Sequence, residues 1–188
     1  MAGFACGSDR DPPVTPTPGV SLPANPTPTP AELAWAERVC LAIQVSQVAA
    51  ARVPEAMVDP TRLSLEERRS RAQSLWSALI PIAESELRTL ESIAPPAAAR
   101  ALHEAIQEQV RVPLAEWRRS LEEIDAIFAS TASVDANNLR LQQRMQEALR
   151  LADRAYVNSP PGVRGALRST DACIGTGLRP DPTPTPRR

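Results

Sequence analysis

The chain has 188 residues and a formal net charge of -1. This length suits one ordinary domain, and the balanced charge provides neither a basic stripe for nucleic-acid phosphates nor a polybasic patch for an anionic membrane surface. We therefore exclude nucleic acid as an expected partner. No stretch reaches the roughly 18 uninterrupted apolar residues that a membrane-spanning helix requires.

Proline and threonine alternate near both ends of the chain, in residues 12–30 and 180–186. Alternating prolines favour extended polyproline II and provide no apolar period from which a core is built. We expect disordered Pro/Thr-rich segments over residues 1–29 and 176–188. Such segments hold a domain away from a surface, and the domain is expected to span residues 30–175.

Cys6 lies in the first of these segments between small residues, with Ala5 before it and Gly7 after it. These positions resemble the cleavage site of a bacterial lipoprotein, in which the cysteine becomes the lipidated first residue, although Gly3 stands where that family usually has leucine. The resemblance implies a lipid anchor at Cys6 and an extracytoplasmic location. It requires a basic and then apolar signal upstream, because only five residues precede Cys6; otherwise this cysteine is incidental.

Between the terminal segments, apolar residues recur at three- and four-residue steps, which predicts helices throughout. The first helix is expected to begin at Pro30 with Thr29 as its N-cap, and to end before Pro54. The second helix is expected to open with a capping box, in which Ser64 and Glu67 exchange hydrogen bonds.

Two prolines fall inside the predicted helices. Pro81 lies in the second helix, which ends at the corner Pro95-Pro96, and Pro113 lies in the third, whose inward stripe runs as far as Phe128. An interior proline costs about 3 kcal/mol, so each predicts a kink or a break. Kinks at similar heights would widen the bundle into a small-ligand cavity, and irregular packing is the alternative.

The fourth helix is expected to follow Ser133 as its cap, with Met145 on its inward stripe. A short fifth helix from Pro161 leads to Cys173. Four amphipathic helices with short links predict an all-α fold, an up-down four-helix bundle with a short fifth helix and disordered Pro/Thr-rich tails.

His103 is the one histidine of the chain. One histidine cannot supply a histidine-rich metal site or the Glu-x-x-His pairs of a di-metal bundle, and no Gly-x-Ser-x-Gly elbow is present for a Ser-His-Asp triad. We predict a protein that is not an enzyme, with no catalytic, cofactor-binding or metal-binding residue. Carboxylates beside arginines, such as Glu122 with Arg118, are expected to form ion pairs on solvated helix faces.

The run from Leu90 to His103 contains a leucine-rich helix end, a Pro-Pro corner and a Leu-His pair. It resembles a run in uncharacterised secreted or lipid-anchored helical-bundle proteins of GC-rich bacteria. The resemblance implies a helical fold and an extracytoplasmic compartment, and it assigns no activity. His103 is expected either to brace the helix corner by a hydrogen bond or to contact a ligand.

The three cysteines make an odd count. If lipid occupies Cys6, then Cys40 and Cys173 remain as an even pair in an oxidising compartment. The first and last helices of an antiparallel bundle are neighbours, so we expect a Cys40–Cys173 disulfide. The alternative is that Cys40, which falls on the inward stripe of its helix, is a buried free thiol.

Together these patterns predict a non-enzymatic, extracytoplasmic helical module, secreted or attached to a membrane by lipid. It is expected to act through contacts with a protein or a small ligand of unknown identity. The alternative is a ligand-binding sensor or carrier with a cavity at the kinks of Pro81 and Pro113.

Overall fold

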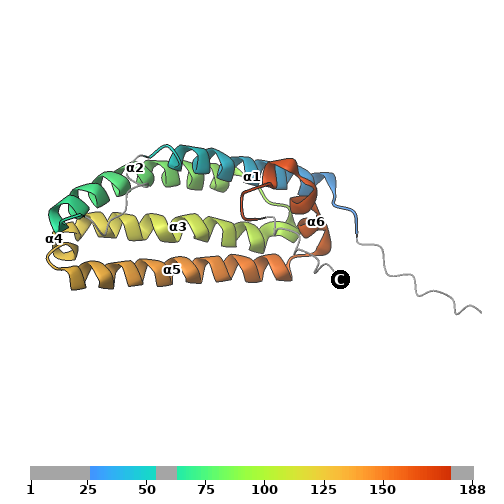
Figure 1. Ribbon diagram of the computed structural model, residues 1–188. Helices are drawn as coiled ribbons and strands as arrows, with labels where there is room; N and C mark the ends of the chain where they lie inside the picture. The colour runs from blue at the N-terminus through green and yellow to red at the C-terminus, as the bar shows by residue number, and fades with distance from the viewer. Residues whose placement is uncertain (1–25, 54–62, 179–188) are drawn as a thin grey trace, which may run out of the picture.

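The computed structural model describes residues 26–53 and 63–178, which form helices and turns with no strand in those ranges. Four long helices alternate in direction, which confirms the predicted all-α bundle (Figure 1). They are α1 (Pro30–Ala50), α2 (Leu65–Ser92), α3 (Arg100–Glu122) and α5 (Thr131–Asn158). The shorter elements are η3 (Ala97–Ala99), α4 (Ile124–Ile127), α6 (Pro161–Ser169) and η4 (Asp171–Cys173).

Side-chain caps fix the starts of the first two helices. Thr29 Oγ1 accepts a hydrogen bond from the Glu32 amide at 3.2 Å, and Glu32 Oε2 accepts from the Thr29 amide at 2.7 Å. Ser64 and Glu67 form the same reciprocal pair at the start of α2. Each pair satisfies two amides that the helix itself leaves without a partner, so both predicted starts are confirmed.

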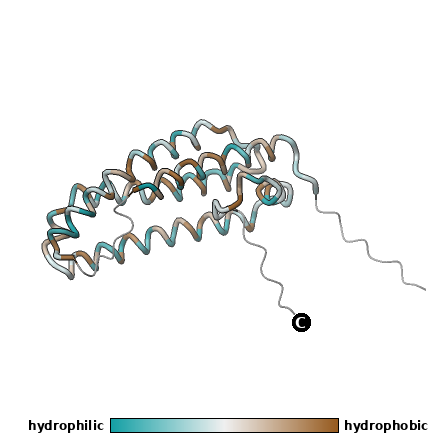
Figure 2. Tube along the Cα trace, turned by 45° about the horizontal axis from the view of Figure 1, so that its top comes forward, coloured by the Kyte–Doolittle hydropathy of each residue, from teal (hydrophilic) through white to brown (hydrophobic). Residues whose placement is uncertain are grey.

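The long helices follow one another in a row. α1 packs on α2, α2 on α3 and α3 on α5, while α6 and η4 pack on α1. In the view of Figure 1, α1 and α2 lie above α3, and α5 lies below it. Hydrophobic and hydrophilic residues recur in turn along the helices, as expected of helices with one buried face (Figure 2). Because α5 packs mainly on α3, the face of α5 that points away from α3 is exposed to solvent.

Two clusters of apolar side chains fill the bundle. The larger one lies where α6 and η4 meet α1. It includes Trp35, Val39, Leu90, Leu102, Ile106, Val163 and Leu167. The smaller one lies at the opposite end, beside α4, and includes Trp76, Ile124, Ile127 and Val134. Trp117 packs against both clusters and so connects the two halves of the core.

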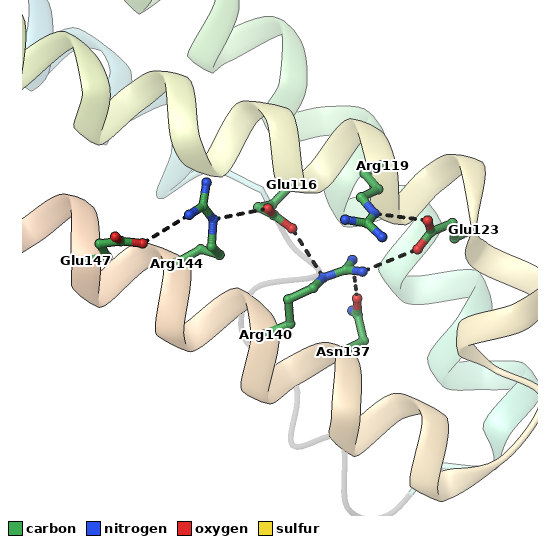
Figure 3. A network of polar contacts seen from close by, with 7 residues as sticks. All are labelled: Glu116, Arg119, Glu123, Asn137, Arg140, Arg144 and Glu147. Carbon is green, nitrogen blue, oxygen red and sulfur yellow. Dashed lines mark hydrogen bonds and ion pairs between the residues drawn. The ribbon is translucent and has the colours of Figure 1, made fainter.

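An ion-pair network joins α3 to α5 (Figure 3). Glu116, whose side chain is 12% exposed, lies 3.3 Å from Arg140 Nε and 3.6 Å from Arg144 Nε. Arg140 also lies 3.4 Å from Glu123. Arg119 donates to Glu123 at 2.9 Å, and this hydrogen bond holds the pKa of Glu123 below its usual range.

Two expected helix boundaries are wrong. α3 ends at Glu122, because Glu123 (φ -97°, ψ 11°) leaves helical geometry, and the stripe continues on the separate turn α4 toward Phe128. The fourth long helix is capped by Ser130, whose Oγ accepts from the Ser133 amide at 3.1 Å. Ser133 therefore lies in the first turn of α5 and is not its cap.

The prediction of an inward Met145 is also wrong. This side chain is 41% exposed, although it lies three residues from the buried Ala148. α5 packs on the rest of the bundle mainly through α3. A helix covered on one side buries a narrower stripe than a helix in a closed bundle, and Met145 falls at the margin of that stripe.

The interior prolines do not break their helices. α2 continues through Pro81 and α3 through Pro113. Each proline lacks an amide proton, so the carbonyls of Ser77 and Gln109, one turn earlier, lose their helical partners. Each proline therefore costs its helix one hydrogen bond. The helix stays continuous because its packing on the neighbouring helices holds the chain in helical geometry.

The ordered core reaches beyond the boundary expected at residue 175. Thr176 Oγ1 donates to the Cys173 carbonyl at 2.9 Å, and the Leu178 amide donates to Thr176 Oγ1 at 3.3 Å. Both Thr176 and Leu178 are buried. The rest of the predicted C-terminal tail, most of the N-terminal one and Cys6 lie outside the described residues.

Candidate functional site

A groove with a volume of about 670 Å³ runs between α1 and α2. α1 carries apolar side chains on its exposed side as well as its buried side, and Leu41 and Val45 face this side of the bundle. The α1 residues that line the groove are Arg38, Leu41, Ala42, Val45, Ser46 and Ala49. The α2 residues are Pro81, Ile82, Ser85, Glu86, Thr89, Ser92 and Ile93.

The groove is apolar along most of its length. Leu41 is 45% exposed and Val45 is 70% exposed, so their aliphatic side chains form open walls of the groove. Because α1 and α2 run antiparallel, Arg38 and Ser92 lie at one end, and Ala49 and Pro81 lie at the other. The end of the groove at Arg38 and Ser92 is therefore more polar than the end at Ala49 and Pro81.

Glu86 provides the one carboxylate of this lining and is half-buried. Burial raises its pKa, and a hydrogen bond with Ser46 acts in the opposite direction. Ser46 has a single hydroxyl proton, which it donates to the Ile43 carbonyl at 2.9 Å. The Ser46 hydroxyl is the side-chain hydrogen-bond partner of Glu86, and it already donates its proton to the Ile43 carbonyl.

A second cavity of about 260 Å³ is lined by residues of α1, α2, α3 and α5, together with Thr176. Its lining includes Pro113, Trp117 and Leu149, and it shares Ser46 and Glu86 with the groove. Pro81 and Pro113 therefore line two different cavities rather than one. The half-buried pair Ser46 and Glu86 borders both of them.

His103 is 3% exposed and lies inside the bundle, away from the groove lining. The indole amide of Trp35 donates to His103 Nδ1 at 3.3 Å, and the Gln107 side-chain amide lies 3.1 Å from Nε2. Burial is the main cause that lowers its pKa. These contacts connect α1 to α3 and favour the interpretation of His103 as a brace over that of a ligand contact.

Cys40 and Cys173 form a disulfide that joins α1 to η4 across a sequence separation of 133 residues. Both cysteines are fully buried. The predicted pairing is therefore confirmed, and the buried free thiol is excluded for Cys40.

Within residues 26–53 and 63–178, no group of three or more His, Cys, Asp and Glu side chains could hold a metal ion. No helix in those ranges has an apolar stretch of sufficient length to cross a membrane. The groove offers an open apolar surface with one carboxylate in its lining.

Glu86 is not among the residues predicted from the sequence. The signal was its spacing: Glu86 is three residues after the inward Ala83 and four before the inward Leu90, so it falls on the buried side of α2. A carboxylate on an apolar stripe indicates either a buried partner or a cavity.

Comparisons of this chain with protein-family models, with curated proteins and with solved structures give no significant match. The site therefore has to be interpreted from its own geometry and chemistry.

Proposed function

We propose that this protein is a non-enzymatic, extracytoplasmic helical domain, carried on Pro/Thr-rich segments, that binds a small apolar ligand in the groove between α1 and α2. The observation that carries the proposal is the groove itself, with about 670 Å³ of space and exposed aliphatic walls. Ligand sites are typically concave and mostly apolar, with few polar groups that fix orientation. Arg38 and Glu86 are the charged groups of this lining.

The Cys40–Cys173 disulfide supports the extracytoplasmic location. Disulfides persist in oxidising compartments and are rare where thiols are kept reduced. The Pro/Thr-rich termini and the lipoprotein-like surroundings of Cys6 are consistent with attachment to a membrane surface through lipid at that residue.

A protein partner on α5 is the second candidate. The exposed large apolar residues of α5 are Leu139, Met145, Leu149, Leu151 and Val157. At 3.6 residues per turn, all of them except Leu151 fall on one side of the helix, which is how a docking helix presents its anchors. Of the two candidates, only the groove is concave, and for this reason we place the ligand site there.

The test is binding of the neutral hydrophobic dye N-phenyl-1-naphthylamine, which fluoresces when it leaves water. Ser85 is exposed and lines the groove, so Ser85→Trp fills the groove without entering the core. We expect the wild type to bind the dye and Ser85→Trp to lose at least about tenfold in affinity.

The matched control is Ser74→Trp, an equally exposed position of α2 outside the groove lining. It should bind the dye as the wild type does. Equal dye binding by the wild type and Ser85→Trp, with both folded by circular dichroism, would refute a ligand site in the groove.

A further inference from the structure

Glu86 differs from the other carboxylates of α2. Glu66, Glu84 and Glu91 each form an ion pair with an arginine, and Glu67 closes the helix cap. Glu86 forms no ion pair within the described ranges, although it is half-buried. In a chain with 21 arginines, this carboxylate faces a cavity instead of a cation.

An unpaired carboxylate in apolar surroundings is costly. Partial burial removes part of its hydration, and a single hydroxyl that already donates elsewhere replaces little of it. A cation that enters the groove with an apolar body would restore the missing partner. It would also bury the exposed walls of Leu41 and Val45.

Arg38 is the other charged group of the groove, and it differs from Glu86 in two respects. It is exposed, and its Nε donates to the Ala34 carbonyl at 3.3 Å. It lies eight residues before Ser46, which is about 12 Å along the helix axis. Because Arg38 keeps its hydration, an anionic ligand would gain less there than a cationic ligand gains at Glu86.

We propose that the groove between α1 and α2 binds an amphiphilic cation, with a protonated amine against the Glu86 carboxylate and an apolar tail along Val45 and Leu41. This proposal rests on the proposed function and names the ligand class of the same site. A charge-assisted hydrogen bond between ammonium and carboxylate fixes the orientation of the ligand, and the apolar walls supply the contact area.

Binding of a cation is linked to ionisation of Glu86. Burial raises the pKa of this carboxyl, and the cation stabilises the ionised form. Affinity should therefore increase as the pH rises through the pKa of Glu86. Arg38 on α1 is the other charged side chain in the two cavities, and the residues of α3 and α5 that line the second cavity are uncharged.

The experiment compares decylamine, decanol and decanoate, each below its micelle concentration, as competitors of N-phenyl-1-naphthylamine at pH 7.5. The three share one tail and differ in the charge of the head group. In the wild type, decylamine should compete at roughly tenfold lower concentration than decanol, and decanoate should be the weakest.

Glu86→Gln should remove the preference for decylamine and leave the competition by decanol within about twofold of the wild type. Glu84→Gln is the matched control, because it removes the same charge from α2 outside the groove lining. It should retain the preference. The neutral probe and decanol report whether each variant still has a groove that binds apolar molecules.

Three outcomes would overturn the proposal while leaving the proposed function intact. They are equal competition by decylamine and decanol in the wild type, an unchanged preference for decylamine in Glu86→Gln, and a preference for decanoate that Arg38→Gln abolishes. Failure of the wild type to bind the dye or any of the three competitors would overturn the proposed function itself.

Discussion

His103 is held inside the bundle in its neutral form. The Trp35 indole amide donates to Nδ1, so that nitrogen carries its lone pair and the proton of the neutral ring lies on Nε2. The Gln107 side-chain amide beside Nε2 must then turn its oxygen toward the ring to accept this proton. The two rings also meet edge to face, with centroids 6.3 Å apart. A proton added at Nδ1 would point at the indole amide and break the contact between α1 and α3.

We predict that protonation of His103 destabilises the fold. Burial lowers its pKa below the ordinary value of 6.5, so the unfolded chain binds this proton at a higher pH than the folded protein does. The stability that His103 contributes is fully present above about pH 6.5 and is lost as the pH falls toward its lower folded pKa. The free energy of unfolding from urea titrations should decrease between pH 7.5 and pH 5.5.

The control is His103→Asn, whose amide can still accept from Trp35 but does not titrate. Its free energy of unfolding should stay flat or increase as the pH falls, because burial raises the pKa of Glu86 and protonation of Glu86 therefore adds stability. A parallel decrease in wild type and His103→Asn would show that another group causes the pH dependence.

At the scale of single helices, the sequence predicts best where the signal is local. The capping boxes of Thr29 and Ser64 depend on residues three positions apart, and both are present as expected. The start of α5 was misplaced because Ser130 and Ser133 are both good caps, and the choice depends on the turn that follows α4. Tertiary contacts, which the sequence pattern does not display, decide between them.

Packing between helices was harder to predict. The stripe of α5 was assigned on the assumption of a closed bundle, in which Met145 would face a neighbour. α5 is covered mainly by α3, and a network of charged side chains occupies part of that interface. Helical periodicity gives the direction of a face, but it does not show how many neighbours cover it.

We predict that Glu116 stabilises the α3–α5 contact. Its side chain is 12% exposed and lies against Arg140 and Arg144. Removal of the carboxylate leaves the partly buried Arg140 guanidinium with Glu123 and Asn137 as its remaining partners, while the exposed Arg144 keeps Glu147. Glu116→Gln should therefore lower the free energy of unfolding by about 1–3 kcal/mol, measured by urea denaturation.

Glu147→Gln serves as the control on the same network. Glu147 pairs with Arg144 at 3.0 Å, but its side chain is 67% exposed. Exposed ion pairs contribute little, so this variant should stay within about 0.5 kcal/mol of the wild type. Equal effects of the two substitutions would mean that burial does not determine the strength of this network.

At the scale of the whole molecule, the fold class and the disulfide could be predicted, and the groove could not. The helical period of the apolar residues and the short links predict an up-down bundle. With Cys6 set aside for lipid, the two remaining cysteines are then expected to form a disulfide. The groove depends on the gap that α1 and α2 leave beside Pro81, and the spacing of Pro81 and Pro113 pointed instead to a shared cavity. Volumes between helices depend on side chains from several elements at once.

The disulfide connects the terminal elements to the bundle. α6 and η4 pack on α1, and Cys173 is covalently joined to Cys40 of that helix. Val163 and Leu167 of α6 are fully buried against the core. In the chain-entropy model, closing a loop of this length stabilises the folded state by roughly 5 kcal/mol.

We therefore predict that loss of the disulfide lowers the melting temperature by roughly 15 °C, which corresponds to about 5 kcal/mol for a domain of this size. The double variant Cys40→Ala, Cys173→Ala should show this decrease in differential scanning calorimetry. Without the link, α6 should also leave the core more often, so trypsin should cleave first after Arg164 and Arg168. Cys6→Ala is the control and should melt as the wild type does. An unchanged melting temperature and trypsin pattern in the double variant would mean that apolar packing alone holds α6 in place.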